Sequence, residues 1–170
     1  MKNLLAIFIL VASFGCTSAQ EKPGVGSSAY DLMLQGLLDR DVSEVSVEQL
    51  GETAPNYLLL DAREKNEFEV SHIKDARWVG YDDFNLDRVS DIPKDSSIVV
   101  YCSVGYRSEK VTQQMRDAGF TNVHNLYGGI FEWSNRNGVL VDPRGKPTEK
   151  VHAYDRVWGV WVTEGKKVYK

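Results

Sequence analysis

The segment IVVYCSVGYRS, residues 98–108, combines a strand, a nucleophile and the start of a helix. Its first four residues are apolar and mostly β-branched, which predicts a buried strand over 98–101. Cys102 follows that strand directly, Gly105 lies in the loop after it, and a helical pattern begins at Ser108. A cysteine between a buried strand and a helix N-terminus lies where backbone N–H groups and the helix dipole favour an anion.

This placement indicates a reactive thiol. Surroundings that favour an anion lower the pKa of a thiol, and only the thiolate attacks an electrophile. Arg107 adds a full positive charge at the helix start, where a positive charge is otherwise unfavourable. We therefore expect Cys102 to be a nucleophile and Arg107 to orient an anionic substrate through two parallel hydrogen bonds. An inert core cysteine is the alternative interpretation of Cys102.

Strands and helices alternate along the rest of the chain, which is typical of a parallel sheet covered by helices on both faces. Short strands are expected over 57–60, 77–79 and 123–126, and short helices over 64–70, 108–118 and 130–137. Residues 29–40 have apolar side chains at helical spacing. Residues 44–50 predict a strand and a helix start, with Ser46 and Gln49 at capping-box spacing. Ligands of such sheets bind beyond the carboxyl ends of strands, where Cys102 lies.

Four motifs in this order resemble those of the rhodanese family of single-domain sulfurtransferases. The active loop of that family reads Cys-x-x-Gly-x-Arg, matched here by Cys102, Gly105 and Arg107. The other matching segments are LLLDAR (58–63), EFEVSHIKDA (67–76) and GGIFEW (128–133). The resemblance covers residues 44–141. It implies an α/β three-layer domain with a central parallel sheet and helices on both faces.

The resemblance also implies an activity that needs no metal or organic cofactor. Sulfane sulfur would move from thiosulfate or a similar small anionic donor to a thiol or cyanide acceptor, through a persulfide on Cys102. Arg107 would act with it. Asp61 and His72 would support the scaffold, and Arg63 would lie at the edge of the cleft. The donor would also be bound by the residues of the active loop, namely Ser103, Val104, Gly105 and Tyr106.

Two functions of other classes remain open. Phosphatases of a related fold use Cys-x5-Arg, whereas the spacing from Cys102 to Arg107 is Cys-x4-Arg, a smaller cradle suited to a sulfur atom. A non-catalytic rhodanese-like binding module is the second alternative, although such domains often lack the cysteine that this chain retains. His124 and His152 have no ligand-like partners, so no metal site is expected. The net charge of −4 gives no argument for nucleic-acid binding. We expect a monomer.

The N-terminus has the features of an export signal. An almost wholly apolar run over 4–14 follows a positively charged start and is too short to span a bilayer as a stable anchor. Residues 13–16 (SFGC) resemble a relaxed bacterial lipobox, in which Cys16 becomes the lipidated first residue. Ordinary cleavage before Gln20 is the alternative. We favour lipidation, and therefore expect membrane attachment through Cys16 and a location in the bacterial cell envelope, as a periplasmic or outer-membrane lipoprotein.

These features divide the chain into four parts. Residues 1–19 are the export signal, 20–28 a flexible tether, 29–142 the rhodanese-like domain with an N-terminal helix, and 143–170 a linker and a β-hairpin extension. The hairpin is expected because two apolar runs, over 157–162 and 167–169, flank a short polar turn. The chain contains two cysteines, Cys16 and Cys102. Because Cys16 is either lipidated or removed with the signal, the mature domain has one free thiol and carries no internal disulfide.

Overall fold

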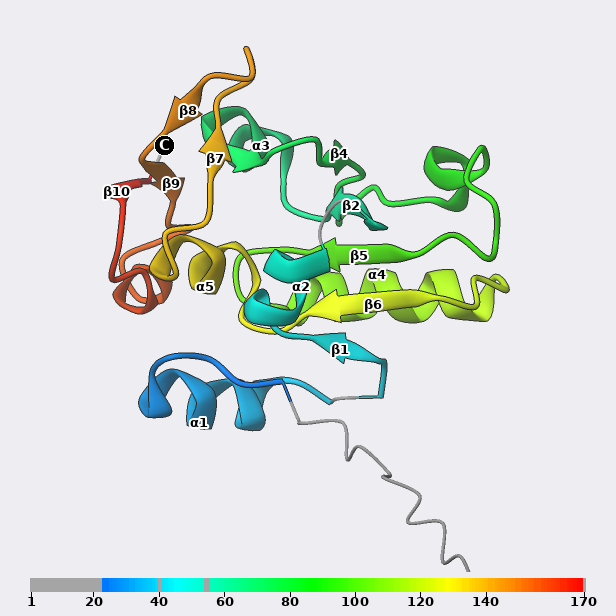
Figure 1. The fold of residues 1–170 in the computed structure, drawn as a ribbon, viewed down its shortest axis with the longest axis horizontal. Helices are drawn as coiled ribbons and strands as arrows, with labels where there is room; N and C mark the ends of the chain where they lie inside the picture. The colour runs from blue at the N-terminus through cyan, green and yellow to red at the C-terminus, as the bar shows by residue number, and fades with distance from the viewer. Residues whose placement is uncertain (1–22, 40, 54–55, 170) are drawn as a thin grey trace, which may run out of the picture.

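The computed structural model describes residues 23–39, 41–53 and 56–169. Its elements are α1 (Ser28–Leu37), β1 (Glu44–Val45), α2 (Val47–Thr53), β2 (Leu58–Asp61), α3 (Lys65–Val70), β3 (His72–Ile73), β4 (Arg77–Trp78), η2 (Leu86–Val89), β5 (Ile98–Tyr101), α4 (Tyr106–Asp117), β6 (Val123–Leu126), α5 (Gly129–Asn135), β7 (Leu140–Val141), β8 (Pro147–Thr148), β9 (Lys150–His152), η3 (Trp158–Trp161) and β10 (Lys166–Val168). Figure 1 shows their arrangement.

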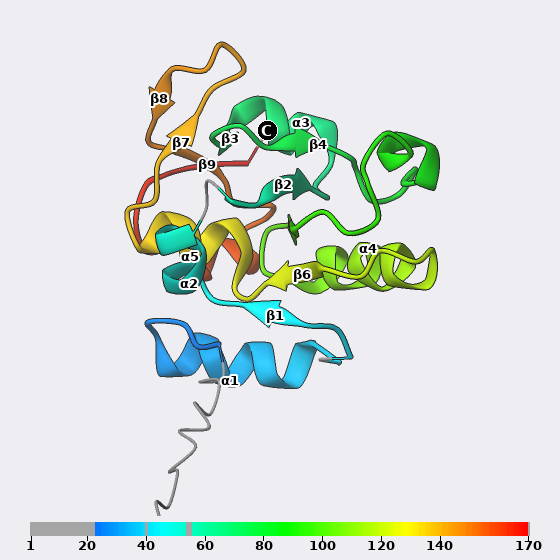
Figure 2. The ribbon, with the colours of Figure 1, turned by 45° about the vertical axis from the view of Figure 1, so that its right-hand side comes forward.

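A five-stranded parallel sheet forms the centre, in the order β1-β6-β5-β2-β4. The sequence alternation of strands and helices is therefore confirmed as an α/β fold. Because β5 lies in the middle of the sheet, its carboxyl end lies at the end of the sheet where ligands of such folds bind. Figure 2 shows α4 running alongside β6, and α1 lying beyond the edge strand β1.

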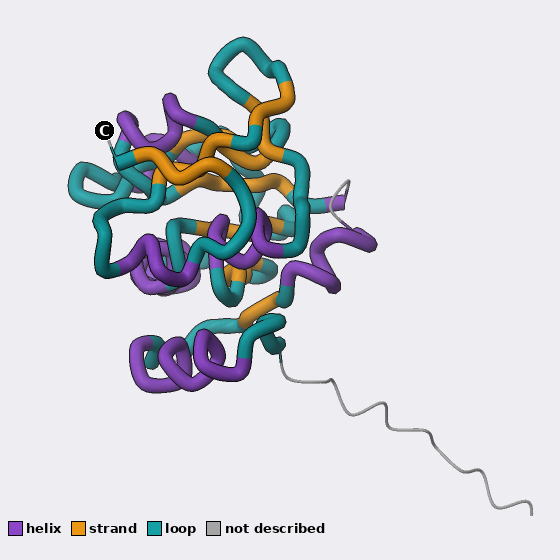
Figure 3. The backbone as a smooth tube through the Cα atoms, turned by 90° about the vertical axis from the view of Figure 1, so that its left-hand side faces the viewer, coloured by secondary structure: helices purple, strands orange, loops and turns teal. Residues whose placement is uncertain are grey.

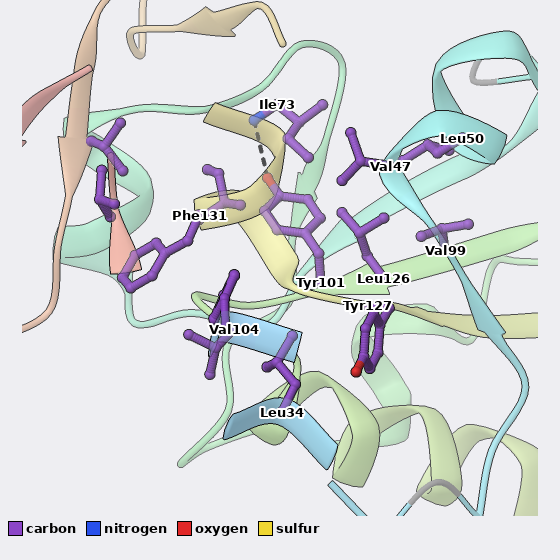
Figure 4. Packing of buried hydrophobic residues seen from close by; sticks show 14 of the residues in the cluster. Leu34, Val47, Leu50, Ile73, Val99, Tyr101, Val104, Leu126, Tyr127 and Phe131 are labelled. Atoms are coloured by element: carbon purple, nitrogen blue, oxygen red, sulfur yellow. Dashed lines mark hydrogen bonds between the residues drawn. The ribbon is translucent and has the colours of Figure 1, made fainter. Parts of the chain in front are cut away.

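The side chains of β5 alternate between two hydrophobic clusters, as those of a strand buried on both faces must. Val99 and Tyr101 belong to a cluster with residues of α1, α2 and α5, whereas Ile98 and Val100 belong to a cluster with residues of α4. Figure 4 shows the first cluster, with the Tyr101 hydroxyl accepting a hydrogen bond from the backbone N–H of Ile73 at 3.2 Å. The sheet thus has helices on both faces, as predicted.

Two helix starts show how local sequence sets the fold. The backbone N–H of Ser46 donates to the side chain of Gln49 at 2.8 Å, and the N–H of Gln49 donates to the Ser46 hydroxyl at 3.1 Å. This reciprocal pair confirms the predicted capping box before α2. Helix α4 begins at Tyr106, two residues earlier than the pattern indicated, because Gly105 serves as its N-cap.

The prediction of a flexible tether over 20–28 is wrong for its described part, residues 23–28. Val25 packs against the first hydrophobic cluster. The backbone N–H of Gly26 donates to the Glu132 carboxylate at 2.7 Å. Ser27 caps α1, and Ser28 already belongs to that helix. These contacts fix the segment to the domain. The predicted export signal and Cys16 lie outside the described residues.

The predicted C-terminal hairpin is also wrong. Residues 158–161 form the 3₁₀ helix η3, and β10 pairs with β9 in parallel. The Asp155 carboxylate accepts hydrogen bonds from the N–H groups of Val157 and Trp158, both at 2.8 Å, which turns the chain into η3 instead of extending it. The Asn135 side chain then holds the exit of η3 through the Trp161 carbonyl and the Thr163 N–H.

The residues after 142 are part of the domain and not an appendage. Val151, Ala153 and Val162 are fully buried in the cluster that also contains Tyr101. Strand β7 pairs in antiparallel fashion with both β3 and β8, which joins the start of this region to the middle of the chain. Figure 3 shows the β7–β8 turn projecting from the body of the domain while the final strands return to it.

Candidate active site

Cys102 lies at the carboxyl end of the central strand and is almost fully buried, with 1% of its surface exposed. Its Sγ accepts a hydrogen bond from the backbone N–H of Gly105 at 3.2 Å. Gly105 has a φ of +116°, a conformation that residues with a Cβ rarely adopt. The glycine therefore turns the loop back so that its N–H faces the sulfur. The twelve-residue helix α4 starts immediately afterwards, and its dipole favours negative charge at that sulfur.

The segment that begins with Gly128 and Gly129 holds the loop from behind. The N–H of Ile130 donates to the Cys102 carbonyl at 2.9 Å, and the N–H of Phe131 donates to the Ser103 carbonyl at 3.1 Å. A Cβ on Gly129 would lie 2.4 Å from the Cys102 carbonyl oxygen, closer than atoms can approach. The matching segment GGIFEW therefore contributes a close backbone approach that fixes the position of the nucleophile.

Arg107 is held by a buried carboxylate that the sequence interpretation missed. Its Nη1 donates to Glu67 Oε2 at 2.6 Å, and its Nη2 donates to Glu67 Oε1 and to the Ser103 hydroxyl, both at 2.9 Å. The Ser103 hydroxyl itself donates to Glu67 Oε1 at 3.1 Å. Glu67 thus ties α3 to the active loop. It lies inside the matching segment 67–76, but nothing in its local pattern marks it as buried.

The charges of this pair support each other. Burial opposes the ionised form of Glu67, but the hydrogen bonds and charge of Arg107 outweigh it and lower the pKa of Glu67. Burial likewise opposes the charge of Arg107, while the hydrogen bonds that it donates to Glu67 and its electrostatic interaction with the nearby Cys102 raise its pKa. Both groups are therefore charged at neutral pH. The guanidinium predicted to orient an anionic substrate is already engaged in two parallel hydrogen bonds within the protein.

His152 borders the same carboxylate as a neutral ring. Its Nδ1 lies 3.9 Å from Glu67 Oε1, a distance that would make an ion pair if the ring were protonated. Burial lowers the pKa of His152, and the attraction of Glu67 does not reverse that shift. In addition, Nδ1 accepts a hydrogen bond from the backbone N–H of Tyr154 at 3.2 Å. We therefore treat His152 as an acceptor that positions Tyr154.

Arg63 does not lie at the cleft edge, and that prediction is corrected. Its side chain is fully buried and donates to Asp61 through both Nε and Nη2, and to the Ser71 carbonyl at 2.7 Å. Burial opposes its charge, but Asp61 raises its pKa. Because Asp61 ends β2 and Arg63 is only two residues further on, the pair closes a local clamp inside the domain. Asp61 therefore has a structural place, as expected for it.

His72 also has the geometry of a scaffold residue. Its ring stacks on Phe68, with centroids 3.9 Å apart, and its Nδ1 lies 3.2 Å from the Phe68 carbonyl. It does not line the cavity beside Cys102. Among the described residues no group of three or more histidines, cysteines or acids is placed to hold a metal ion.

A cavity of about 340 Å³ opens beside Cys102. The active loop supplies one side of it, and residues from four other parts of the chain supply the rest. Its lining residues are Leu37, Glu64, Tyr81, Asp82, Cys102, Ser103, Val104, Tyr106, Arg107, Tyr154 and Trp158. A larger cavity, of about 740 Å³, lies between the β7–β8 turn and β10, but it shares no lining residue with the active loop. The smaller cavity is the candidate active site because it contains Cys102.

The sequence interpretation anticipated only part of this cavity. The loop residues from Ser103 to Tyr106 are brought together as expected, with Val104 buried and Tyr106 exposed. Glu64, Asp82 and Tyr154 were not anticipated, because each comes from a segment distant in sequence from the loop. Trp158, from η3, also lines the cavity, while Trp161 stacks on Tyr30 with centroids 5.3 Å apart.

Comparison with known proteins agrees with the motifs. The rhodanese-like domain family matches residues 46–136. A protein named sulfurtransferase from Allochromatium vinosum is 33% identical over 107 residues, which cover 61% of this chain and 99% of that protein. A tRNA uridine(34) hydroxylase from Erwinia tasmaniensis is 36% identical over 100 residues, which cover 54% of this chain. This match spans only 29% of the hydroxylase's length.

A solved structure gives the same fold. The crystal structure of a rhodanese-related protein from Thermoplasma volcanium aligns with a TM-score of 0.53 at 23% identity, covering 58% of this chain and 97% of that one. At this identity the likeness concerns the fold alone. The family match extends over more than half of the chain and includes β2, the active loop and the segment beginning with Gly128 and Gly129 that holds it. The chain therefore belongs to the rhodanese-like domain family.

Proposed function

We propose that this protein is a sulfurtransferase that moves sulfane sulfur from thiosulfate or a similar donor to a thiol or cyanide acceptor. The observation that carries the proposal is the Sγ of Cys102, which faces a cavity while accepting the N–H of Gly105 at the start of α4. A thiolate there is stabilised by fixed dipoles instead of by water. The relative named sulfurtransferase supports the same reaction class.

The reaction proceeds as two displacements. The Cys102 thiolate attacks the outer sulfur of the donor, so that a bond from Sγ to that sulfur forms and the donor's own S–S bond breaks. With thiosulfate, sulfite leaves with the bonding electron pair. An acceptor thiolate or cyanide then attacks the sulfane sulfur of the persulfide, and Cys102 departs as a thiolate. Electrons balance over the cycle, so neither an oxidant nor a cofactor is needed.

Arg107 serves this cycle mainly as a fixed positive charge beside the nucleophile. Because Glu67 occupies both of its terminal nitrogens, the guanidinium cannot swing away to follow a substrate. This pairing also disfavours the phosphatase alternative. A phosphatase of this type needs its arginine free to grip phosphoryl oxygens, and here a buried carboxylate already fills that position. A non-catalytic module would not need to hold a thiol in this way.

Persulfide formation tests the proposal directly. The protein is incubated with thiosulfate and, separately, with an organic persulfide, and then analysed by intact-mass and peptide-level mass spectrometry. We expect one added sulfur on Cys102 with at least one donor, release of that sulfur to cyanide, and neither event in Cys102→Ser. Turnover retained in Cys102→Ser, or no sulfur on Cys102 with either donor, would overturn the proposal.

We also propose that the protein is exported to the cell envelope and anchored there through Cys16. The support lies in the sequence of residues 4–16. None of the described helices is long and apolar enough to cross a membrane. A lipid-modified Cys16 at the mature N-terminus is the expected result of mass spectrometry on the native protein. A free N-terminus at Gln20 would contradict the anchor, and Cys16→Ala should release an anchored protein without impairing sulfur transfer.

A further inference from the structure

The cavity beside Cys102 has two ends with opposite electrostatic character. At its inner end, the N–H of Gly105 and the start of α4 favour negative charge. The lining also contains the side chains of Glu64 and Asp82 and several aromatic rings, and we call this part of the cavity, which includes the exposed Asp82, its mouth. Asp82 is exposed and Glu64 half-buried. The inner end therefore suits a thiolate or persulfide anion, whereas the mouth repels a ligand that carries negative charge on its outer part.

The only basic side chain among the described residues that line this cavity does not offset the acids. Arg107 is paired with Glu67, and two further acids, Glu64 and Asp82, line the same cavity. The pKa of Glu64 is raised, chiefly by burial and by the nearby Asp82 carboxylate, although the backbone N–H of Asp82 and the charge of Arg107 offset part of that shift. A dianion entering between Glu64 and Asp82 would be repelled by their charges.

Aromatic rings complete the mouth. Tyr154 and Trp158 face the active loop from the C-terminal region, and Tyr81 and Tyr106 are the other rings of the lining. The Tyr154 ring lies over the Arg107 guanidinium, 5.3 Å from its carbon to the ring centroid. Its backbone has a φ of +60°, unusual for a tyrosine, and the hydrogen bond to His152 holds it there. Rings and carboxylates together are the groups with which proteins bind organic ammonium ions.

We propose that the sulfur donor is a small organic persulfide that carries an ammonium group, and that the thiosulfate dianion is a poor donor. This inference rests on the sulfur transfer proposed above. The Cys102 thiolate attacks the outer sulfur of R–S–SH, a new S–S bond forms to Sγ, and the inner S–S bond breaks. The departing R–S sulfur takes the electron pair and the proton, leaving R–SH and the Cys102 persulfide anion. A cavity of about 340 Å³ is large enough for such a ligand.

A pair of thiol reagents with the same two-carbon chain and opposite charge tests the charge selection without requiring sulfur transfer. These are 2-aminoethyl and 2-sulfonatoethyl methanethiosulfonate. In both, the Cys102 thiolate attacks the sulfenyl sulfur and methanesulfinate leaves. The rate of labelling at Cys102 is followed by peptide-level mass spectrometry, in the folded protein and in urea. We expect the cation-to-anion rate ratio to be higher in the folded protein than in urea.

Variants assign this ratio to the two acids. Glu64→Gln and Asp82→Asn should each lower the cation-to-anion ratio by about threefold or more, the Coulomb effect of one charge several ångströms away. Glu69→Gln, which removes an exposed acid from the same α3 segment but does not line the cavity, should leave the ratio unchanged. Equal ratios in folded and unfolded protein, or an equal effect of all three substitutions, would overturn the inference.

A second measurement separates this inference from the proposed function. Sulfur loading of Cys102 is compared between 2-aminoethyl persulfide and thiosulfate at matched concentrations. We expect faster loading from the aminoethyl persulfide, and a gain for thiosulfate in Asp82→Asn. Faster loading from thiosulfate would contradict the donor class while leaving sulfur transfer intact. No loading from either donor would instead contradict the proposed function.

Discussion

The two sides of the catalytic cavity are built in different ways. One side, the active loop, is six consecutive residues, 102–107, which run from the end of β5 into the first two residues of α4. The other side is assembled from separate segments, and its Tyr154 and Trp158 come from a part of the chain that follows the family-matched segment 46–136. The loop holds Cys102, the group proposed to react, and the other side holds side chains that a ligand must pass to reach it. In this protein the reaction is therefore set locally, whereas selectivity depends on chain segments that meet only in the folded state.

Arg107 connects the two sides. Its guanidinium donates two hydrogen bonds to Glu67 and packs against the ring of Tyr154. A substitution on either side should therefore change the surroundings of this arginine, but the measurable consequences should differ. Loss of Glu67 should affect folding, loss of Arg107 itself should affect the reaction, and loss of Tyr154 should affect ligand binding.

The largest effect is expected from Glu67→Ala. The side chains of Glu67 and Arg107 are 2% and 14% exposed, so the substitution leaves a mostly buried guanidinium without its partner. Breaking a buried pair in this way should cost about 3 kcal/mol in the free energy of unfolding, measured by urea denaturation. Asp83→Asn, which breaks an exposed pair with Arg88, is the control and should cost at most about 1 kcal/mol. Similar losses of stability in both variants would contradict a larger contribution from the buried Glu67–Arg107 pair.

The next effect in size is kinetic and is expected from Arg107→Ala. Removing the fixed charge beside Cys102 should lower kcat/KM for sulfur transfer by roughly 10–1000-fold, which corresponds to about 1.4–4 kcal/mol of transition-state stabilisation. Arg107→Lys keeps the charge but not the two parallel hydrogen bonds to Glu67, so its kcat/KM should lie between those of the alanine variant and the wild type. Unchanged kcat/KM in the alanine variant, at unchanged stability, would remove Arg107 from the mechanism.

Tyr154→Ala should act on the opposite side of the comparison. The ring lines the cavity and is 48% exposed, so its removal should change stability little. We expect KM for the organic persulfide to rise by about fivefold, the effect of one aromatic–cation contact, with kcat nearly preserved. Val160→Ala, an exposed change in the same region outside the cavity, is the control. A fall in kcat without a change in KM would assign Tyr154 to the reaction instead of to binding.

The smallest effect is expected in the pH dependence of stability. Because Arg107 lowers the pKa of Glu67 in the folded protein below its ordinary value of 4.5, the ionised pair stabilises the fold above pH 4.5. That stability should be lost as the pH falls below 4.5 and the carboxylate takes up a proton. Urea denaturation of wild type and Glu67→Gln across pH 3–7 measures this, and the variant should show a shallower decline. Parallel curves would contradict the stated direction of the pKa.

Several features of this protein could be predicted from sequence because the signals are local. The apolar run at 98–101, the glycine at 105 and the helical pattern after it determine a strand, a turn and a helix within a dozen residues. The capping box at Ser46 and Gln49 spans a single helical turn, and it formed as predicted. Each of these depends on backbone propensities and hydrogen bonds between near neighbours, which a sequence displays directly.

Other features required the tertiary structure. The family resemblance placed Arg63 at the cleft edge, but the ion pair with Asp61 allows it to be fully buried. The run at 157–162 has the composition of a strand, yet Asp155 turns it into η3, and Asn135, from a helix much earlier in the chain, holds its end. Composition indicates that a residue can be buried or extended. It does not show which distant partner will be present.

The sequence by itself thus determined the active loop with its cysteine and the α/β fold, because these follow from contiguous residues whose backbone geometry is nearly independent of the rest of the chain. Only the tertiary structure decided what surrounds the nucleophile. Glu67 reaches Arg107 across 40 residues of sequence, and Tyr154 reaches it from a segment beyond the matched domain. Such contacts arise when burial of the hydrophobic clusters brings separate segments together, and the charge and shape of the cavity are a consequence of that packing.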